Sequence, residues 1–397
     1  MVLGVTGGIA AYKAVQIARD LTALGAEVDV VLTPTAKRFV GALSFSGVTG
    51  RPVESRMLSP GGGALHVRLG AEADVVVVAP ATADLIARLA QGRADDLLTA
   101  VVLAAKGPVL LAPAMNDRMF AHPQTVRNLE HCRDVLGYRI VGPTTGALAV
   151  GEGEGAGRML EPEEIREHVG RALGGDPTYA GRRVLVTAGP TREPIDPVRF
   201  VGNRSSGRMG FALAREAWLR GADVVLVTGP SELAPPSDVT VRRVETAREM
   251  LAAAKGEVPA AHYLFFAAAV SDFRPAEARS EKIKRANAKG GLALDLVENP
   301  DVILETIALR RRDATAVGFA LETEDMDGGA GRKLEEKRLD LVVGNDPGES
   351  GAGFEVPTNR VTLYFPDRTA EALPLMTKEA VARVILDRAA RFAVGRA

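Results

Sequence analysis

The sequence has one cysteine, one tryptophan and five histidines among its 397 residues. A single cysteine, Cys132, excludes an intramolecular disulfide framework and a metal centre built from several thiolates. The charges nearly cancel, with 50 Asp+Glu against 49 Lys+Arg. This balance argues against binding of nucleic acid or of an anionic membrane through overall electrostatic attraction. No apolar run reaches the ~20 residues that a membrane span needs. Because the first residues also lack a basic leader, we expect a soluble protein of the cytoplasm.

What the sequence does contain is a repeated alternation of short apolar runs with amphipathic stretches. "VLGVTGG" precedes "AAYKAVQIARDLTALG", and "ADVVVVAP" precedes "ATADLIARLAQG". Continuously apolar strands joined by helices indicate parallel sheets covered on both faces. The chain length favours more than one domain, and a polar stretch with Gly and Pro at 171–183 separates two such alternations. We therefore predict an α/β protein of two Rossmann-like three-layer α/β/α domains with mainly parallel sheets, over 1–175 and 181–397.

Small and polar residues follow the predicted strands of the first domain. Gly7 and Gly8 form a turn that opens a helix, and Thr33 and Thr82 stand at two further strand ends, where open α/β sheets bind their ligands. The turn can hold a phosphate on free N–H groups, and the two hydroxyls can hold a phosphate or the edge of a flavin ring. A tight turn without a ligand is the alternative. The absence of the pattern GxGxxG argues against an ordinary NAD-dependent dehydrogenase.

Four segments, taken in order, resemble the family of FMN-dependent cysteine decarboxylases, which includes the phosphopantothenoylcysteine decarboxylases. They are "GVTGGIAAYK", "APATADLIARLAQGRADDLL", "PAMNDRMF" and "GRML". The resemblance spans nearly all of residues 1–170, with Phe120 where the family has Trp. It implies FMN as the oxidant of the substrate thiol, after which the adjacent carboxylate is lost as CO2. His66 matches the family's active-site base, and Asn116 matches the residue that holds the substrate carboxylate. Alone, His66 is also compatible with a structural histidine and Asn116 with a helix N-cap.

The stretch "GALAVGEGEGAGRML" at 146–160 resembles the glycine-rich flap that covers the substrate in the decarboxylases of coenzyme A synthesis. In those enzymes a flap cysteine supplies a proton when the enethiol intermediate is reduced, and here Val150 stands in its place. Either another donor, such as water or Glu152, completes the reaction, or the reaction stops at the enethiol. Cys132 lies in a separate helical stretch and is not assumed to substitute. No position of the family matches His122, His131 or His168, and these three histidines are expected at the surface.

The second half opens with "VLVTAGPTREPIDPVRFVGNRSSGRMG" at 184–210, which places a long loop between a strand and a helix. Such a loop is unusual unless it is functional. This stretch and five segments further along resemble the bacterial, CTP-using phosphopantothenate–cysteine ligases. The five segments are "AAAVSDFRP", "EKIKR", "ENPDV", "VGFALET" and "KLEEKRLDLVVGND". The resemblance implies that 4'-phosphopantothenate attacks the α-phosphate of CTP, and that the cysteine amine then attacks the acyl-cytidylate. This chemistry needs positive charge and normally Mg2+.

The same resemblance assigns roles to individual residues. Lys282 matches the lysine of acyl-cytidylate formation, with a solvated basic run as the alternative, and Asn203 matches the residue that holds the intermediate for the second step. Asp272 is the first candidate for a Mg2+ ligand. Lys333 and Lys337 would share one helical face and reach a triphosphate together, unless they form a salt-bridged helix with the neighbouring glutamates 335 and 336. The residues implied in CTP binding are Ala267, Ala268, Asp272, Lys282, Asn299, Pro300, Asp301, Val302, Phe319, Lys333 and Lys337.

The two resemblances together predict a bifunctional enzyme of coenzyme A biosynthesis. The C-terminal domain would form phosphopantothenoylcysteine, and the N-terminal domain would decarboxylate it to 4'-phosphopantetheine. The alternative keeps the ligase and makes the N-terminal half an FMN-binding assembly module of incomplete turnover, because Val150 replaces the family cysteine. The resemblance also implies a homo-oligomer, with trimer contacts in the flavin domain and dimer contacts in the ligase domain.

Overall fold

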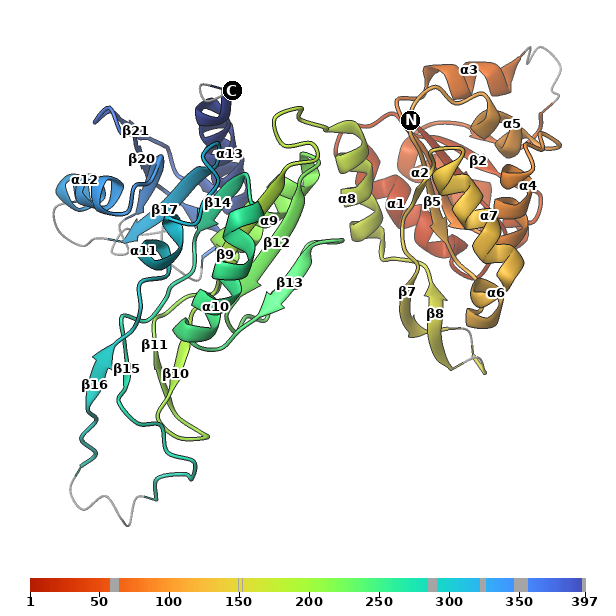
Figure 1. The fold of residues 1–397 in the computed structure, drawn as a ribbon. Helices are drawn as coiled ribbons and strands as arrows, with labels where there is room; N and C mark the ends of the chain where they lie inside the picture. The colour runs from red at the N-terminus through yellow and green to blue at the C-terminus, as the bar shows by residue number, and fades with distance from the viewer. Residues whose placement is uncertain are drawn as a thin grey trace. The chain divides into compact units, whose positions relative to one another are not determined.

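The computed structural model describes residues 1–57, 64–148, 150–151, 153–284, 291–321, 326–345 and 356–394. The chain divides into two compact units, Met1–Gly174 and Gly175–Ala397 (Figure 1). Each unit has a mainly parallel sheet with helices on both faces, which confirms the predicted fold class. Among the described residues, no helix combines the length and the apolar character that crossing a bilayer requires.

The sheet of the first unit has six parallel strands in the order β3-β2-β1-β4-β5-β6. Its strands are β1 (Val2–Val5), β2 (Asp29–Leu32), β3 (Val53–Glu54), β4 (Val76–Ala81), β5 (Val109–Pro113) and β6 (Arg139–Ile140). Alternate side chains of the strands enter two separate hydrophobic clusters, one on each face: Leu3 belongs to one cluster and Val2 to the other. Burial on both faces explains why these strands read as unbroken apolar runs.

Helices cover both faces of this sheet. One face is covered by α1 (Ala11–Ala23), α2 (Ala42–Thr49) and α8 (Pro162–Leu173). The other is covered by α3 (Leu65–Glu72), α4 (Ala83–Ala90), α5 (Leu97–Leu103) and α7 (Pro123–Asp134). The short α6 (Asp117–Ala121) follows β5, and a hairpin of β7 (Thr144–Ala147) and β8 (Glu154–Arg158) precedes α8.

The expectation for the three histidines is confirmed for two and wrong for the third. His122 and His131 are exposed, whereas His168 is buried on α8. The reason is its helical spacing, because His168 lies on the same face as the buried Ile165 and Val169, and α8 packs that face against α1.

The second unit has an eight-stranded sheet in the order β13-β12-β9-β14-β17-β18-β20-β21. Its strands are β9 (Arg183–Ala188), β12 (Asp223–Thr228), β13 (Thr240–Arg243), β14 (Tyr263–Phe266), β17 (Thr315–Leu321), β18 (Leu341–Asn345), β20 (Thr362–Tyr364) and β21 (Ala370–Ala372). The first six strands in that order are parallel, and β20 and β21 form an antiparallel hairpin before the last helix. A small pair of β19 (Thr358–Asn359) and β22 (Met376–Thr377) flanks that hairpin in the sequence.

In the described part of this unit, helices cover both faces of the sheet. One face is covered by α9 (Arg208–Leu219) and α13 (Lys378–Val394), and the other by α10 (Ala247–Glu257), α11 (Val302–Ile307) and α12 (Met326–Glu336). Phe211, Leu213 and Trp218 of α9 are buried, as their spacing predicts.

The long loop after β9 is a hairpin of β10 (Arg192–Pro194) and β11 (Phe200–Gly202). It packs beside a second antiparallel pair, β15 (Phe273–Pro275) and β16 (Leu296–Glu298), which follows β14. Figure 1 shows both pairs leaving the main sheet of the second unit together. We call these two pairs the arm.

Residues 176–180, which lie between the predicted domain ranges, belong to the second unit. Tyr179 is fully buried there, and its hydroxyl donates to the carbonyl of Leu386 at 2.7 Å. Its ring lies 4.4 Å from that of Tyr263, centroid to centroid. The chain therefore enters the core of the second unit before β9 begins.

Candidate functional site

The first unit holds a cavity of about 850 Å3 where β1, β2, β4 and β5 end. The predicted residues Gly7, Gly8, Thr33, Thr82 and Asn116 all line it. Carboxyl ends of neighbouring parallel strands converge at one edge, which brings residues more than a hundred positions apart to one place.

The turn at Gly7 and Gly8 depends on the absence of side chains. A Cβ on Gly7 would lie 2.2 Å from Cγ2 of Thr35, so only glycine lets the loop after β2 approach this closely. The helix that follows, α1, has no acidic residue in its first turn and no side-chain cap at its N-cap, Ala10. Backbone N–H groups at such a helix start fit the phosphate of a ligand.

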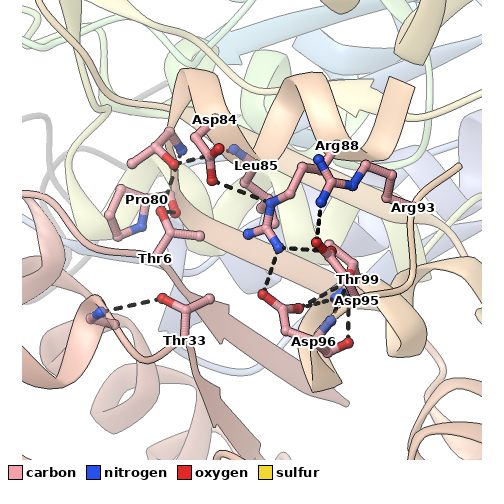
Figure 2. A network of polar contacts seen from close by, with 12 residues as sticks. Thr6, Thr33, Pro80, Asp84, Leu85, Arg88, Arg93, Asp95, Asp96 and Thr99 are labelled. Carbon is pink, nitrogen blue, oxygen red and sulfur yellow. Dashed lines mark hydrogen bonds and ion pairs between the residues drawn. The ribbon is translucent and has the colours of Figure 1, made fainter. Parts of the chain in front are cut away.

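Threonines at the edge of the cavity are held by hydrogen bonds, several of which Figure 2 shows. The hydroxyl of Thr6 donates to the carbonyl of Pro80 at 2.6 Å and accepts from the amide of Thr82 at 3.3 Å. Thr33 donates to the carbonyl of Val5, and Thr82 caps α4 by accepting from the amide of Leu85. These bonds hold the threonine side chains in place around the cavity.

One wall of the cavity is an ion-pair network around Arg88 (Figure 2). The Arg88 guanidinium contacts Asp96 at 2.7 Å, Asp95 at 3.1 Å and Asp84 at 3.2 Å. Asp96 also caps α5 by accepting from the amide of Thr99 at 2.8 Å. Burial alone would lower the pKa of Arg88, but hydrogen bonds to Asp96 and Asp95 raise it, so the side chain stays charged and fixed.

The glycine-rich stretch at 146–160 is the β7–β8 hairpin, and its glycines allow close contact with the segment after β5. The amide of Met115 donates to the carbonyl of Gly157 at 3.0 Å, and a Cβ on Gly157 would lie 2.2 Å from the Met115 carbonyl oxygen. A Cβ on Gly155 would lie 2.6 Å from that of Asp117. Val150 is fully exposed at the hairpin tip, and Glu152 lies outside the described residues. The hairpin thus lies against the cavity wall at its base and reaches solvent at its tip.

A buried lysine holds the base of this hairpin. Lys13 of α1 donates to Glu161 at 2.9 Å and to the carbonyl of Met159 at 3.3 Å, and Arg158 donates to the same carboxylate at 2.6 Å. The hydrogen bond from Lys13 is the main cause of a lowered pKa at Glu161. Both cations line the cavity, and neither was predicted from the sequence. The sequence did contain a signal for Lys13, because a charged residue on the same face of α1 as the apolar Ala14 and Ile17 indicates a buried, paired side chain.

Asn116 is the N-cap of α6, since its Oδ1 accepts from the amide of Arg118 at 2.9 Å. The cap uses the oxygen only, so the Nδ2 donors remain suited to a carboxylate. His66 lies on α3 and is not among the residues that line the cavity. Its Nδ1 is buried and has no hydrogen-bond partner among the described residues. The catalytic roles of Asn116 and His66 stay predictions.

Cys132 is buried on α7, with its Sγ 3.9 Å from the carbonyl of Ile86. Burial raises the pKa of its thiol to about 11. A neutral, enclosed thiol is a poor proton donor to a ligand in the cavity, in agreement with the sequence interpretation.

In the second unit the structure brings several predicted residues to the ends of β9 and β14. Ala267 and Ala268 both donate backbone N–H groups to Thr187, at 3.1 and 3.4 Å. Asn203 donates to the carbonyl of Val270 at 2.8 Å. The amide of Asn299 donates to the Asp272 carbonyl at 2.8 Å, which links these segments to the start of α11.

The two predicted lysines near α12 also reach this region. Lys337 forms an ion pair with Asp301 at 2.6 Å, and Lys333 donates to the carbonyl of Phe319 at 2.7 Å. Asp301 caps α11 as well, because it accepts from two backbone amides of that helix. Pro300 precedes this cap, and Val302 is buried beneath it. The lysines therefore contact other residues of the predicted CTP site, rather than only the glutamates of their own helix.

The side chains of two predicted residues stand apart from these contacts. Lys282 is exposed on the segment after β15, and the Asp272 side chain is also exposed. Within the described ranges, no group of three or more His, Cys, Asp or Glu residues is arranged to hold a metal ion. A Mg2+ ion bound chiefly through phosphate oxygens needs only one or two protein carboxylates, so Asp272 stays a prediction.

Comparison with known proteins agrees with this division of the chain. Residues 1–174 match the family described as Flavoprotein, and residues 179–392 match the family described as DNA/pantothenate metabolism flavoprotein C-terminal domain. The fold and these matches define a two-unit flavoprotein of pantothenate metabolism.

The similarity to curated relatives extends over nearly the whole chain. The coenzyme A biosynthesis bifunctional protein CoaBC of Vibrio cholerae is 43% identical, with 97% of this chain and 96% of the relative covered. The protein of that name from Mycobacterium bovis is 45% identical, with coverage of 100% and 97%. A crystal structure of the C-terminal domain of a CoaBC protein is 36% identical over 55% of this chain and 100% of that one, with a TM-score of 0.48. The chain belongs to the family of bifunctional coenzyme A biosynthesis proteins CoaBC.

Proposed function

We propose that the chain carries out two consecutive steps of coenzyme A biosynthesis. The second unit joins cysteine to 4'-phosphopantothenate with CTP, and the first unit decarboxylates the product to 4'-phosphopantetheine with FMN. The observation that carries this proposal is the identity of 43–45% with bifunctional relatives over 97% of the chain or more. The alternative of a ligase with an inactive flavin module is not favoured, because this similarity includes the first unit.

In the first unit, the helix start after Gly7 and Gly8 is suited to binding the FMN phosphate. Thr33 and Thr82 are suited to binding other polar edges of the cofactor. FMN, when bound, supplies the two-electron oxidation of the substrate thiol. The Nδ2 group of Asn116 would hold the substrate carboxylate, and His66 would accept a proton. The β7–β8 hairpin closes the cavity at Ala147, Leu148 and Gly157.

The proton for the final reduction cannot come from the side chain at position 150, because valine has no ionisable hydrogen. Cys132 is enclosed on α7. Water and Glu152 are the candidate donors.

In the second unit, Lys333 and Lys337 are suited to the CTP phosphates. Lys282 would stabilise the charge that develops when the phosphopantothenate carboxylate attacks the α-phosphate. Asn203 would hold the acyl-cytidylate for attack by the cysteine amine. Mg2+ would bridge phosphate oxygens, with Asp272 as its protein ligand.

Exposed apolar side chains support a homo-oligomer. On the arm and the segments next to its strands they are Val198, Phe200, Phe273, Leu292, Leu294, Leu296 and Val297, and the first unit exposes Leu43 and, at the cavity, Ile9 and Tyr12. Exposed apolar side chains are suited to contacts between copies of the chain, and the resemblance implies dimer contacts in the second unit and trimer contacts in the first. Light scattering after size exclusion should give a mass above one chain, and Phe200→Glu should lower that mass.

The two activities can be separated within one polypeptide. Lys282→Gln should abolish pyrophosphate release from CTP but leave CO2 release from supplied phosphopantothenoylcysteine unchanged. His66→Asn should do the reverse. Removal of Mg2+ by EDTA should stop only pyrophosphate release. A wild-type protein that releases no pyrophosphate under any of these conditions would exclude the ligase assignment.

A further inference from the structure

The turn of the β10–β11 hairpin, residues 195–199, is tied to the segment that carries Lys282. The amide of Arg279 donates to the carbonyl of Ile195 at 2.9 Å. The amide of Ile283 donates to Asp196 at 3.1 Å, and the Ile283 carbonyl accepts from the Arg199 guanidinium at 3.2 Å. Both backbone polar groups of the residue after Lys282 are thus held by one hairpin turn.

Asp196 is the centre of these contacts. Its side chain is wholly enclosed. One carboxylate oxygen accepts from the amides of Val198 and Arg199, both at 2.8 Å. The other accepts from the Arg199 guanidinium at 2.6 Å and from the Ile283 amide. Burial would raise the pKa of Asp196, but these backbone N–H groups and the Arg199 charge lower it to about 2.

The two oxygens therefore serve different parts of the arm. One closes the turn of its own hairpin, and the other reaches 87 residues along the chain to fix Ile283. The Lys282 side chain itself is exposed and lies on a segment without a regular strand of its own. Asp196 holds the Ile283 amide directly, and a planar peptide transmits the position of one residue to the next, so loss of this bond would loosen the backbone that carries the lysine.

We propose that Asp196 is a positioning residue for Lys282, and that its carboxylate fixes the lysine for acyl-cytidylate formation. This inference rests on the proposed ligation. It gives the "EPIDPVRF" stretch a role in the reaction, although Asp196 itself does not contact the reacting atoms.

Asp196→Asn is the informative variant, because it separates the two tasks of the carboxylate. The amide oxygen can still accept from Val198 and Arg199 and close the turn. The amide nitrogen then faces the Ile283 N–H and the Arg199 guanidinium, donor against donor. Asp367→Asn is the matched control, since Asp367 is an exposed turn carboxylate of the same unit that accepts from Thr369.

The experiment compares full-length wild type, D196N and D367N in three measurements. Calorimetric titration with CTP counts folded nucleotide sites, hydrogen exchange reports protection of the Ile283 amide, and pyrophosphate release is expressed per CTP site. We expect D196N to bind CTP with unchanged stoichiometry, to lose Ile283 protection, and to release pyrophosphate about 10- to 100-fold more slowly, the scale of a small misplacement of a catalytic group. D367N should match wild type.

The inference is overturned if D196N loses Ile283 protection but keeps a rate per site within a factor of two of wild type. It is also overturned if the rate falls only as far as the number of CTP sites falls, because that result describes loss of folded protein. Failure of the proposed function is distinguishable, since wild type itself would then release no pyrophosphate.

Discussion

Nζ of Lys337 lies 2.6 Å from Oδ2 of Asp301, which joins the end of α12 to the start of α11. Burial would raise the pKa of Asp301, but the hydrogen bond from Lys337 and those from two helix amides lower it. The carboxylate therefore stays charged and holds the lysine beside the segment predicted to bind CTP. An approaching triphosphate meets a cation whose position is already restricted, which lowers the entropic cost of binding.

Lys337→Met should raise the KM for CTP and lower kcat/KM about 10- to 100-fold, since a hydrogen bond to a charged group contributes about 1.5–3 kcal/mol. Steady-state pyrophosphate release at varied CTP measures this change. Lys255→Met is the control, because Lys255 pairs with Glu305 at 3.0 Å as an exposed ion pair. Equal kinetics for both variants would contradict a role of Lys337 in CTP binding.

Gly157→Ala should impair decarboxylation about tenfold or more, because the added Cβ would lie 2.2 Å from the Met115 carbonyl and displace the hairpin from the cavity. Release of CO2 from phosphopantothenoylcysteine measures the effect. Gly47→Ala in α2 is the matched control, since a Cβ there meets nothing within 4 Å. Unchanged CO2 release in G157A would show that the hairpin does not have to lie against Met115.

Cys132→Ala should leave phosphopantetheine formation unchanged, because the thiol is buried and its pKa is raised to about 11. Mass spectrometry of the product distinguishes phosphopantetheine from the enethiol, which is lighter by two hydrogens. In the native protein the thiol should also resist thiol-specific reagents until urea exposes it. Accumulation of enethiol in C132A alone would identify Cys132 as the missing proton donor.

The contribution of Asp196 to stability should depend on pH in a defined direction. Its folded pKa of about 2 lies below the ordinary value of 3.8, so the stabilisation is nearly complete above about pH 5 and is lost as the pH falls from there toward 2. The difference in unfolding free energy between wild type and D196N should be constant from pH 7 to about 5 and shrink below about 4. Urea unfolding followed by Trp218, the only tryptophan and a buried residue of this unit, measures it. A difference that persists unchanged at pH 3 would contradict the assignment.

Tyr179→Ala should destabilise the second unit by about 3–5 kcal/mol, the cost of deleting a large buried ring, and Tyr179→Phe by about 1–2 kcal/mol for the lost hydrogen bond. Trp218 fluorescence in urea reports both. Leu375→Ala is the control, because Leu375 is exposed in the same unit. Equal stability of Y179A and L375A would place residues 176–180 outside the core.

Much of this architecture could be predicted from local patterns. Unbroken apolar runs indicate parallel strands, and the carboxyl ends of such strands meet at one edge, so the cavity around Gly7, Thr33 and Asn116 follows from the order of the segments. The contacts that could not be predicted join distant positions. Lys13 meets Glu161 across 148 residues, and Asp196 meets Ile283 across 87. No local pattern encodes such pairs, because each depends on how complete elements pack.

The most direct test of the whole account is mass spectrometry of one reaction that contains the purified full-length chain, 4'-phosphopantothenate, cysteine, CTP and Mg2+. The account predicts 4'-phosphopantetheine, formed with release of pyrophosphate, CMP and CO2, despite the valine at position 150. A reaction that stops at phosphopantothenoylcysteine or at the enethiol would contradict the function proposed for the first unit, and a reaction that forms no amide would contradict that of the second.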